Sequence, residues 1–348
     1  MQFKTILTNW YSVNKRDLPW RNTKNPYYIW LSEIIMQQTQ VKQGLPYYEA
    51  FIKQYPTVFD LANAEEIQVL KLWQGLGYYS RARNLHYSAK QIAYDLNGIF
   101  PNTYSEILKL KGIGDYTASA IASICFNEAT AVVDGNVYRV LSRYFGIDTP
   151  INSTTGTKEF KKLATTLIDA DNPGDYNQAL MEFGATQCKP KNPYCLVCPL
   201  NESCAALQKG LVKNLPVKLK KTKTVKKYFN FLVIVLDKNK TVFEKRDKKG
   251  IWQNLYQFPL IETEEELTEE KFRSNRKIQD YFENATFEFS LYNTETLVHK
   301  LSHQHLYTKF WIIEMKQLKK PSIPISEIKN YPVPIVIGNF VEEFDFDY

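Results

Sequence analysis

The sequence predicts a mainly α-helical domain over residues 1–208, followed by an α+β domain over residues 228–348. Three observations predict this order. Residues 1–208 repeat apolar side chains three and four positions apart, between turns containing Pro, Gly or Asn. Residues 209–227 (KGLVKNLPVKLKKTKTVKK) carry eight lysines and no acid, as a linker would. From Tyr228 onward, β-branched and aromatic runs of strand length take over.

The helical pattern is clearest in seven segments of the first domain, namely 29–37, 62–73, 81–95, 104–110, 117–125, 136–145 and 158–169. The lysine-rich linker is expected to be exposed. Its charge fits either a solvated tether or a segment that lies near phosphates, and the sequence leaves both open.

In the second domain, YFNFLVIVL (228–236), TVFEKR (241–246) and FWIIEM (310–315) predict strands. NLYQFPLIE (254–262) predicts a turn or short strand, and 264–283 a charged helix. The acidic tail VEEFDFDY (341–348) is expected to fray.

Composition narrows the function classes. The balance of 44 basic and 37 acidic residues gives a formal charge of +7, which permits a nucleic-acid partner without requiring one. There is no basic segment followed by a long apolar run near the start, and no apolar stretch of 18 residues. We therefore expect a soluble, cytoplasmic protein with reduced thiols and no membrane partner.

Four of the five cysteines form a C-x6-C-x2-C-x5-C pattern, Cys188, Cys195, Cys198 and Cys204. In a reduced compartment this indicates one metal site. The spacing favours an iron–sulfur cluster, and a structural zinc remains the alternative. An electron-carrying ferredoxin would use the tighter C-x2-C-x2-C-x3-C run. Cys125, in an apolar helix, is expected to be an inert core thiol.

Two carboxylates stand in unusual surroundings. Glu33 is the one acid in YIWLSEIIMQQTQ (28–40), where apolar neighbours would raise its pKa and suit it to donate a proton; a surface position remains the alternative. Asp134 ends the apolar run AVVD before Gly135 and a helix, as an N-cap would, and would be ionised there. A protonated and an ionised carboxyl group in one cleft can cleave a glycosidic bond. Whether the two meet does not follow from the sequence, because 101 positions separate them.

The stretch LKGIGDYTA (110–118) places Gly112 and Gly114 between two helices. Glycines let the backbone approach a ligand, and the following helix offers free N–H groups to an anion. The pattern fits a sequence-independent grip on a DNA phosphate or an ordinary helix–helix turn.

These stretches occur in the order of one known family. LPWR (18–21), WLSEIIMQQTQV (30–41), WQGLGYYSRARNLH (73–86), LKGIGDYTA, VDGNVYRVL (133–141) and the four cysteines resemble adenine DNA glycosylases of the MutY family. GIWQNLYQFP (250–259) and VHKLSHQHL (298–306) are similar to that family's C-terminal domain.

The resemblance implies a helix-hairpin-helix glycosylase fold with a 4Fe–4S cluster on the four cysteines, then a Nudix-like domain that reads the lesion strand. No Nudix catalytic box (REx2EE) occurs in 228–348, so nucleotide hydrolysis is not expected. The implied partner is double-stranded DNA with adenine opposite 8-oxoguanine or guanine, bound by a monomer.

The resemblance also implies residue roles. Glu33 would protonate the adenine, Asp134 would stabilise the oxocarbenium-like sugar, and Tyr116 and Asn136 would hold these two groups. Further positions match residues around the extruded adenine (Arg21, Met36, Gln178), the wedge in the base stack (Gln38, Thr39, Tyr78), the phosphate grip (Gly112, Gly114) and the loop that recognises 8-oxoguanine (Ser302, His303).

Two positions depart from the family pattern. Leu301 stands where the recognition loop carries Phe, so no aromatic face is available there. Asp115 adds a negative charge to the phosphate-gripping hairpin, and Lys109 and Lys111 are expected to offset it.

Two rival functions share many of these features. A glycosylase/lyase of the endonuclease III type needs an amine that forms a Schiff base, and related enzymes have Lys where this chain has Tyr116. A non-catalytic lesion sensor would need neither Glu33 nor Asp134. Both rivals are therefore disfavoured.

Overall fold

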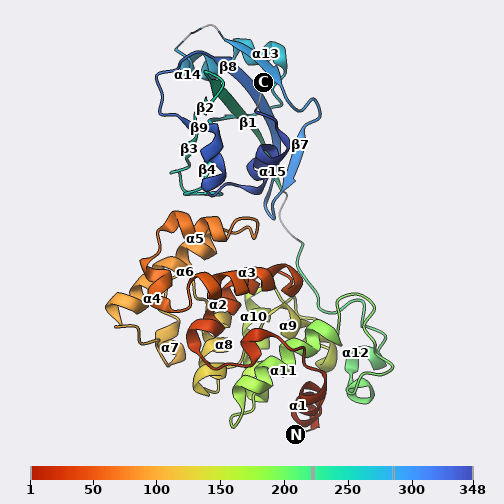
Figure 1. Ribbon diagram of the computed structural model, residues 1–348. Coiled ribbons are helices and arrows are strands. Elements are labelled where there is room, and N and C mark those ends of the chain that lie inside the picture. The colour runs from red at the N-terminus through yellow and green to blue at the C-terminus, as the bar shows by residue number, and fades with distance from the viewer. Residues whose placement is uncertain (1, 221–223, 284, 286, 347–348) are drawn as a thin grey trace. The chain divides into compact units, whose positions relative to one another are not determined.

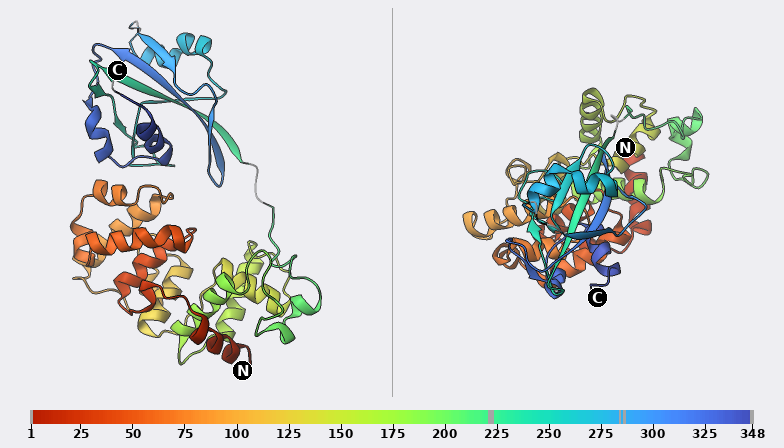
Figure 2. Two further views of the ribbon diagram at one scale, coloured as in Figure 1. Left: turned by 45° about the vertical axis from the view of Figure 1, so that its right-hand side comes forward. Right: turned by 90° about the horizontal axis from the view of Figure 1, so that it is seen from above.

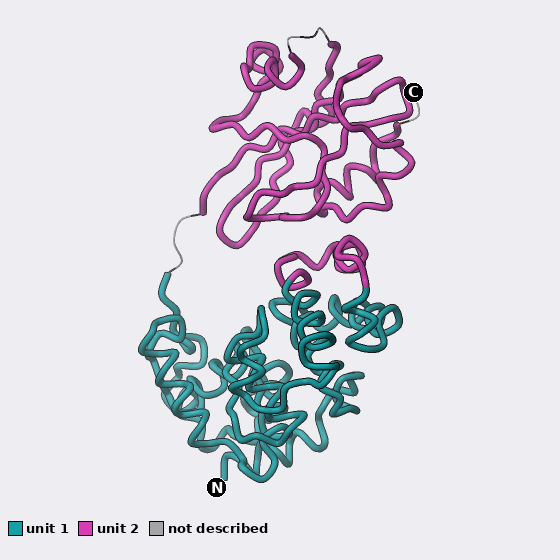
Figure 3. The backbone as a smooth tube through the Cα atoms, turned by 90° about the vertical axis from the view of Figure 1, so that its left-hand side faces the viewer, with its two compact units in different colours: residues 1–63, 84–220 teal, residues 64–83, 221–348 magenta. Residues whose placement is uncertain are grey.

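The computed structural model describes residues 2–220, 224–283, 285 and 287–346. The chain packs into two compact units, shown in Figure 3. Unit 1 comprises residues 1–63 and 84–220, and unit 2 comprises residues 64–83 and 221–348. Unit 2 therefore includes a short segment from the first quarter of the chain.

Unit 1 is helical, as predicted (Figure 1). Its elements are α1 (Gln2–Asn14), η1 (Pro19–Arg21), α2 (Pro26–Met36), α3 (Val41–Gln54), α4 (Val58–Asn63), most of α6 (Ser80–Lys90), a π-helical turn (Gln91–Asp95), α7 (Tyr104–Ile107), α8 (Asp115–Phe126), α9 (Gly135–Phe145), α10 (Thr154–Leu167), α11 (Pro173–Thr186), η3 (Asn201–Ser203) and α12 (Ala205–Gln208).

Helix α8 lies at the centre of unit 1. Every residue from Thr117 to Ile124 is buried, and α8 packs against both α2 and α11. Its sequence TASAIASI is rich in small side chains, which lets neighbouring helices approach closely. This packing brings the start of α8 close to α2.

The predicted hairpin around LKGIGDYTA forms between α7 and α8. Gly112 has φ +82°, and a Cβ there would lie 2.5 Å from Cβ of Asn84 on α6. Gly114 is the N-cap of α8 and faces open space. Gly112 is thus required by the turn itself, whereas Gly114 leaves the helix N-terminus accessible.

The charge of Asp115 is offset differently from our expectation. Lys161 of α10 forms an ion pair with Asp115 at 2.9 Å, and the Tyr104 hydroxyl donates a hydrogen bond to the same carboxylate at 2.7 Å. Lys111 instead lies 4.3 Å from the ring centroid of Tyr87. Sequence spacing favoured the adjacent lysines, but the fold brings Lys161 across from another helix.

Unit 2 is built on a seven-stranded sheet within the described residues, with the central order β6-β8-β1-β2-β9; β5 pairs with β1 and β7 with β8. The long strands β1 (Val225–Leu236) and β8 (Gln304–Met315) run parallel, side by side, and the other pairs are antiparallel (Figure 2). The remaining strands of the sheet are β2 (Lys240–Thr241), β5 (Leu260–Thr263), β6 (Glu288–Leu291), β7 (Leu297–Lys300) and β9 (Ile323–Pro324).

Some predicted elements of unit 2 are divided in the structure. TVFEKR is not one strand, because its two ends pair in different sheets: Thr241, in β2, pairs with β1, whereas β3 (Glu244–Lys245) pairs separately with β4 (Tyr256–Gln257). The charged helix 264–283 is two helices, α13 (Glu269–Ser274) and α14 (Arg276–Tyr281), because the Asn275 side chain caps α14.

The tail is more ordered than predicted. After η4 (Ile325–Asn330) and α15 (Ile335–Glu343), Phe344 stacks on Phe340 at 5.0 Å, and Phe346 contacts Phe344 at 4.7 Å. The acidic side chains suggested fraying, but the alternating aromatic residues anchor the tail. Residues 347–348 lie outside the described part of the chain.

The segment 64–83 holds α5 (Glu66–Leu72) and the loop that leads to α6. The predicted single helix 62–73 is broken between α4 and α5, where Glu65 and Gln68 form a capping box. Among the described residues, no helix is both long and apolar enough to cross a membrane.

A pair of glycine substitutions tests the hairpin geometry. Gly112→Ala should lower the free energy of unfolding by about 1–3 kcal/mol, since it forces a Cβ into a left-handed backbone and onto Asn84. The matched control Gly114→Ala, at a position with open space, should cost less than about 1 kcal/mol. Urea unfolding followed by circular dichroism measures both; equal costs would contradict this reading of the turn.

Candidate active site and cysteine-lined pocket

Glu33 projects from α2, a helix that the Asn25 side chain caps and that buries most of its residues. The Tyr116 hydroxyl of α8 donates a hydrogen bond to Glu33 Oε2 at 2.7 Å. Burial raises the pKa of Glu33 to about 7; the bond from Tyr116 opposes this rise and the nearby charge of Asp134 adds to it. Glu33 therefore titrates near neutral pH, and the alternative of an ordinary surface glutamate does not fit.

Tyr116 links α2, α8 and α11. Its hydroxyl lies 2.7 Å from Glu33 and 3.3 Å from Sδ of Met181. Burial raises the pKa of Tyr116 well above its usual value, and the carboxylates of Glu33 and Asp134 raise it further. Because the hydroxyl carries one hydrogen, Tyr116 can donate to an ionised Glu33, or accept from a protonated Glu33 while donating to Met181. The same geometry thus serves both protonation states.

Asp134 is the N-cap of α9, and its negative charge acts on Glu33. Its Oδ1 accepts hydrogen bonds from the backbone N–H groups of Asn136 at 2.9 Å and Val137 at 2.8 Å, and Oδ2 accepts from Asn136 Nδ2 at 2.7 Å. Burial raises the pKa of Asp134, and these bonds act against that rise. Three donors to the carboxyl group favour its ionised form.

Asn136 is itself held from the far side by Arg139. Arg139 Nη2 donates to Asn136 Oδ1 at 2.8 Å and to the Gly184 carbonyl at 2.6 Å, and Nε donates to the Cys188 carbonyl at 2.7 Å. A Cβ on Gly184 would lie 2.6 Å from that of Asn136, so only glycine allows α11 to pass this close. The orientation of Asp134 is therefore coupled to α11 and to the start of the cysteine loop, the segment 188–204 that carries the four cysteines.

A second group lies along α11. Glu182, with a fully buried side chain, accepts hydrogen bonds from Arg16 Nε and Nη2, both at 2.7 Å, and from Arg21 Nη2 at 2.5 Å. Burial would raise the pKa of Glu182, but the two guanidinium groups outweigh it and lower the pKa to about 2. One turn earlier, Gln178 Oε1 accepts from the Tyr11 hydroxyl at 3.4 Å.

Sequence reasoning selected Arg21 and Gln178 but missed Glu182, Arg16, Met181 and Arg139. The signal for Glu182 was present, because it is an acid within the apolar helical run ALMEFGA. Met36 packs where α3 approaches α2, since a Cβ on Gly44 would lie 2.7 Å from Met36 Sδ. These contacts fix the positions of Arg21 and Met36.

In unit 2, one pocket joins the segment 64–83 to the sheet domain. Its lining includes Tyr78, Arg83, Trp252, Ser302 and His303. Ser302 and His303 are exposed, and Ser302 Oγ lies 3.3 Å from His303 Nδ1. Tyr78, about half exposed, therefore shares a pocket with the predicted recognition loop.

Two of the predicted wedge residues have an uncommon backbone. Tyr78 has φ +47° and Gln38, in unit 1, has φ +54°. The Thr39 hydroxyl donates to the Gln37 carbonyl at 3.2 Å beside Gln38. Left-handed backbone at a residue other than glycine is costly and is concentrated at functional positions.

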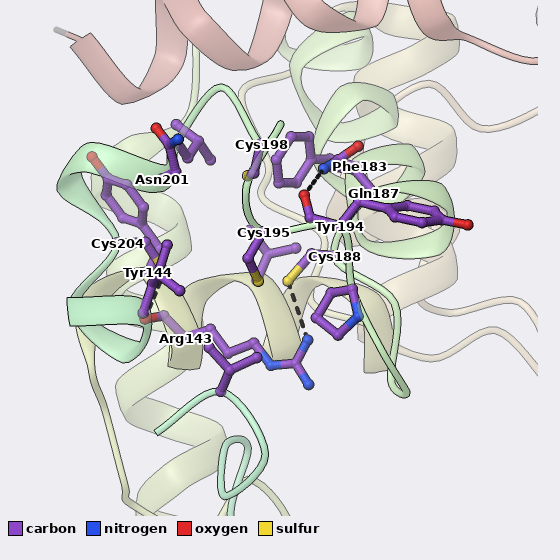
Figure 4. A pocket seen from close by; sticks show the side chains of 15 residues that line it. Arg143, Tyr144, Phe183, Gln187, Cys188, Tyr194, Cys195, Cys198, Asn201 and Cys204 are labelled. Atoms are coloured by element: carbon purple, nitrogen blue, oxygen red, sulfur yellow. Dashed lines mark hydrogen bonds between the residues drawn. The ribbon is translucent and has the colours of Figure 1, made fainter. Parts of the chain in front are cut away.

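The four cysteines line a single pocket between α9, the end of α11 and α12 (Figure 4). Arg143 Nη1 lies 3.4 Å from Cys188 Sγ, and the same guanidinium group donates to the Lys189 carbonyl at 2.8 Å. Burial raises the pKa of Cys198 to about 11. Cys125 lies elsewhere, on α8, where it is partly buried and burial raises its thiol pKa to about 12.

Four thiols around one apolar pocket, with a cation beside them, fit a group that binds thiolates. Within the described residues, no three His, Cys, Asp or Glu side chains are placed to hold one metal ion.

Comparisons with known proteins agree with this fold. Residues 31–165 match the family model of the HhH-GPD superfamily base excision DNA repair proteins, and residues 230–343 match the NUDIX domain. The solved structure of a thermostable thymine-DNA glycosylase is 31% identical, with a TM-score of 0.55, over 60% of this chain and 95% of that one. A trapped endonuclease III–DNA complex, 21% identical with a TM-score of 0.52 over 60% of this chain and 95% of that one, shares the fold.

The chain is thus a base excision DNA repair protein in which an HhH-GPD domain precedes a NUDIX-like α+β domain. An adenine DNA glycosylase of Buchnera aphidicola subsp. Baizongia pistaciae is 40% identical over 313 residues, 89% of this chain and 86% of that protein. The human adenine DNA glycosylase is 44% identical over 60% of this chain and 40% of its own length. This chain belongs to the adenine DNA glycosylase family, as its motifs predicted.

The buried acid on α11 gives a prediction about stability. Glu182→Gln should lower the free energy of unfolding by about 3 kcal/mol or more, because it leaves two guanidinium groups facing an uncharged partner. The control Asp169→Asn breaks the more exposed pair with Lys4 and should cost at most about 1 kcal/mol.

The pH dependence of the free energy of unfolding tests whether the cost of Glu182→Gln comes from the lost charge pairing. Since the folded state lowers the pKa of Glu182, its contribution is present above the pKa of an unfolded glutamate and is lost as pH falls toward about 2. The difference between wild type and Glu182→Gln in urea unfolding should therefore shrink in acid. A constant difference would contradict the charge pairing.

Proposed function

We propose that this chain is a monofunctional glycosylase that hydrolyses the N-glycosidic bond of adenine opposite 8-oxoguanine or guanine in duplex DNA. The observation that carries the proposal is the group of Glu33, Tyr116 and Asp134, in which a carboxyl group with a pKa near 7 faces a hydrogen-bonded carboxylate. This pairing of a protonated and an ionised acid is what cleavage of a glycosidic bond requires.

Glu33 is the proposed general acid. Its carboxyl proton passes to a ring nitrogen of the extruded adenine, so that the bond electrons leave with a neutral base. With a pKa of about 7, a large fraction of Glu33 carries that proton at neutral pH. Tyr116 holds the side chain throughout, since its hydroxyl can accept from one protonation state and donate to the other.

Asp134 is the proposed stabiliser of the positive charge that develops on the sugar. Two backbone N–H groups and the Asn136 amide fix its carboxylate, so little reorganisation is needed as the charge forms. Water then adds to the sugar and completes hydrolysis. Arg21, Met36 and Gln178 are proposed to contact the adenine base, with Glu182 holding Arg21 in place.

Tyr116 also supports the monofunctional assignment over the lyase alternative. A lyase of this fold forms an imine between an amine and the sugar, and a phenol cannot form one. Burial raises the pKa of Tyr116, so its hydroxyl stays protonated at neutral pH. We therefore propose that the enzyme removes the base and leaves the strand intact.

DNA recognition is assigned to groups in both units. Gly112 and Gly114 are proposed to present the start of α8 to a phosphate, and Gln38, Thr39 and Tyr78 to fill the gap left by the adenine. Ser302 and His303 are proposed to contact 8-oxoguanine. The left-handed backbone of Gln38 and Tyr78 supports the wedge role, because such strain is concentrated at functional positions.

Cys188, Cys195, Cys198 and Cys204 are proposed to hold one 4Fe–4S cluster. Bound there, the cluster would fix the loop between α11 and α12 rather than act on substrate. With four ligands from the protein, it would have no open position for a substrate. Arg143 would balance the charge of the thiolates, and Lys189 and Lys191 would be carried on the same loop.

A base-release assay tests the central proposal. The full-length protein should release adenine from duplexes with adenine opposite 8-oxoguanine, and more slowly opposite guanine, with strand scission appearing only after alkali. Glu33→Gln should slow release by at least ~100-fold while DNA affinity is retained. No release from either duplex would refute the activity, and scission without alkali would favour the lyase.

The proton on Glu33 predicts a pH profile. The single-turnover rate should fall as pH rises through about 7, because ionised Glu33 cannot act as an acid. Tyr116→Phe removes a hydrogen bond that lowers the pKa of Glu33, so the fall should move to higher pH. Tyr94→Phe, which loses an exposed hydroxyl bonded to Asn63, is the control and should keep the wild-type profile. A shift to lower pH in Tyr116→Phe would contradict the assignment.

A further inference from the structure

The loop that carries Tyr78 has an unusual backbone. Gly75, Gly77 and Tyr78 have φ values of +98°, +72° and +47°. The glycines adopt such angles without steric cost, but a tyrosine does not. Since Tyr78 is also about half exposed, its own side-chain packing does not account for this conformation, and other contacts must hold the loop.

One set of contacts comes from the same segment. Trp73 Nε1 donates to the Gly77 carbonyl at 3.1 Å, and Arg81 Nη2 donates to the same carbonyl at 3.2 Å. The Arg81 guanidinium group lies 5.1 Å from the ring centroid of Trp73 and 5.7 Å from that of Tyr78. These contacts hold the middle of the loop.

A second set comes from the far end of the sequence. The Tyr79 hydroxyl accepts a hydrogen bond from the Gly75 N–H at 3.2 Å and donates to the Val333 carbonyl at 3.2 Å. Gln74 Oε1 accepts from the Val333 N–H, also at 3.2 Å. Tyr79 is only 6% exposed, so its two partners are not readily replaced by water. Both ends of the loop are thus fixed to one residue before α15.

A third contact lies on the following turn of α6. Arg83 Nη1 donates to the Gln253 carbonyl at 2.8 Å, and the adjacent Asn254 Nδ2 donates to Glu66 Oε1 of α5 at 2.6 Å. Segment 64–83 lies within the HhH-GPD match, whereas residues 253 and 333 lie within the NUDIX match. All of these residues belong to unit 2.

We propose that Tyr79 is a positioning residue that holds the Tyr78 wedge, and that the NUDIX-like segments around Gln253 and Val333 support this wedge in addition to carrying the lesion-recognition loop. The proposal rests on the wedge role given to Tyr78 above. Tyr79 would not touch the reacting atoms. Loss of its hydroxyl would break the link between the Gly75 N–H and the Val333 carbonyl, with the Gln74 bond to Val333 still in place, and would let Tyr78 relax toward an ordinary backbone conformation.

The test uses full-length protein and a duplex with adenine opposite 8-oxoguanine and the fluorescent base 2-aminopurine in the adjacent step. Its fluorescence rises when the step is unstacked, so the rise at saturating Glu33→Gln protein reports insertion of the wedge without base release. In this background, Tyr78→Ala should abolish most of the rise. Tyr79→Phe should reduce it by roughly 3- to 10-fold, the range expected for one or two hydrogen bonds. Tyr94→Phe should leave it unchanged.

In protein with Glu33 intact, Tyr79→Phe should slow single-turnover release by a similar factor at saturating protein, with the midpoint of its pH profile unchanged. An unaltered fluorescence rise in Tyr79→Phe, with the rise lost in Tyr78→Ala, would overturn the proposal while the proposed function stands. An unaltered rise in Tyr78→Ala would instead refute the wedge role itself.

A second variant tests the same proposal if Tyr79→Phe does not fold. Arg83→Met removes the bond to the Gln253 carbonyl outside the loop and keeps an aliphatic side chain of similar length. It should reduce the fluorescence rise in the same direction. If Arg83→Met leaves the rise unchanged, the supporting role of the NUDIX-like segments is refuted.

Discussion

Keeping the carboxyl group of Glu33 away from water is the constraint on which the rest of the site depends. A glutamate with an ordinary pKa would be ionised at neutral pH and could not donate a proton. Burial within α2 and against α8 raises the pKa to about 7, and the hydrogen bond from Tyr116 limits this rise. The two effects oppose each other, so the result depends on how tightly α2, α8 and α11 pack. The run of small buried residues on α8 is what makes that packing possible.

Asp134 is in the opposite situation, because its hydrogen bonds favour the ionised form. It is nearly as buried, yet each oxygen accepts hydrogen bonds, and it begins α9 where the helix dipole favours a negative charge. Arg139 then connects Asn136 to the Gly184 and Cys188 carbonyl groups. A change in the cysteine loop would therefore reach the carboxylate through two hydrogen-bonded residues. This gives the cysteine loop a physical route to the site even though it lies outside the reacting group.

The local chemistry of the site could be predicted, but its assembly could not. AVVDGN predicted an N-cap at Asp134, and the lone acid of α2 predicted a raised pKa at Glu33, because both depend on neighbours within a few positions. Their proximity depends on the packing of α2, α8 and α9, which no local pattern encodes. The partners of Glu182 could not be predicted for the same reason, since the two arginines lie more than 160 positions away, although the acid in an apolar helical run was itself a local signal. Family resemblance supplied the pairing of acids that periodicity could not.

The segment 64–83 shows that the division of the chain into domains also depends on packing that the sequence pattern does not reveal. A lysine-rich linker and a change from helical to strand periodicity both divide the chain near residues 209–227, and the family matches lie on either side of it. Packing divides the chain differently, because α5, the loop that carries Tyr78 and the first turn of α6 form hydrogen bonds with residues 331, 333 and 253. Most of the acceptors are backbone carbonyl groups, which leave no trace in side-chain chemistry. On the side of residues 253, 331 and 333 the residue types therefore carry no signal of these contacts, and the contacts are visible only in the fold.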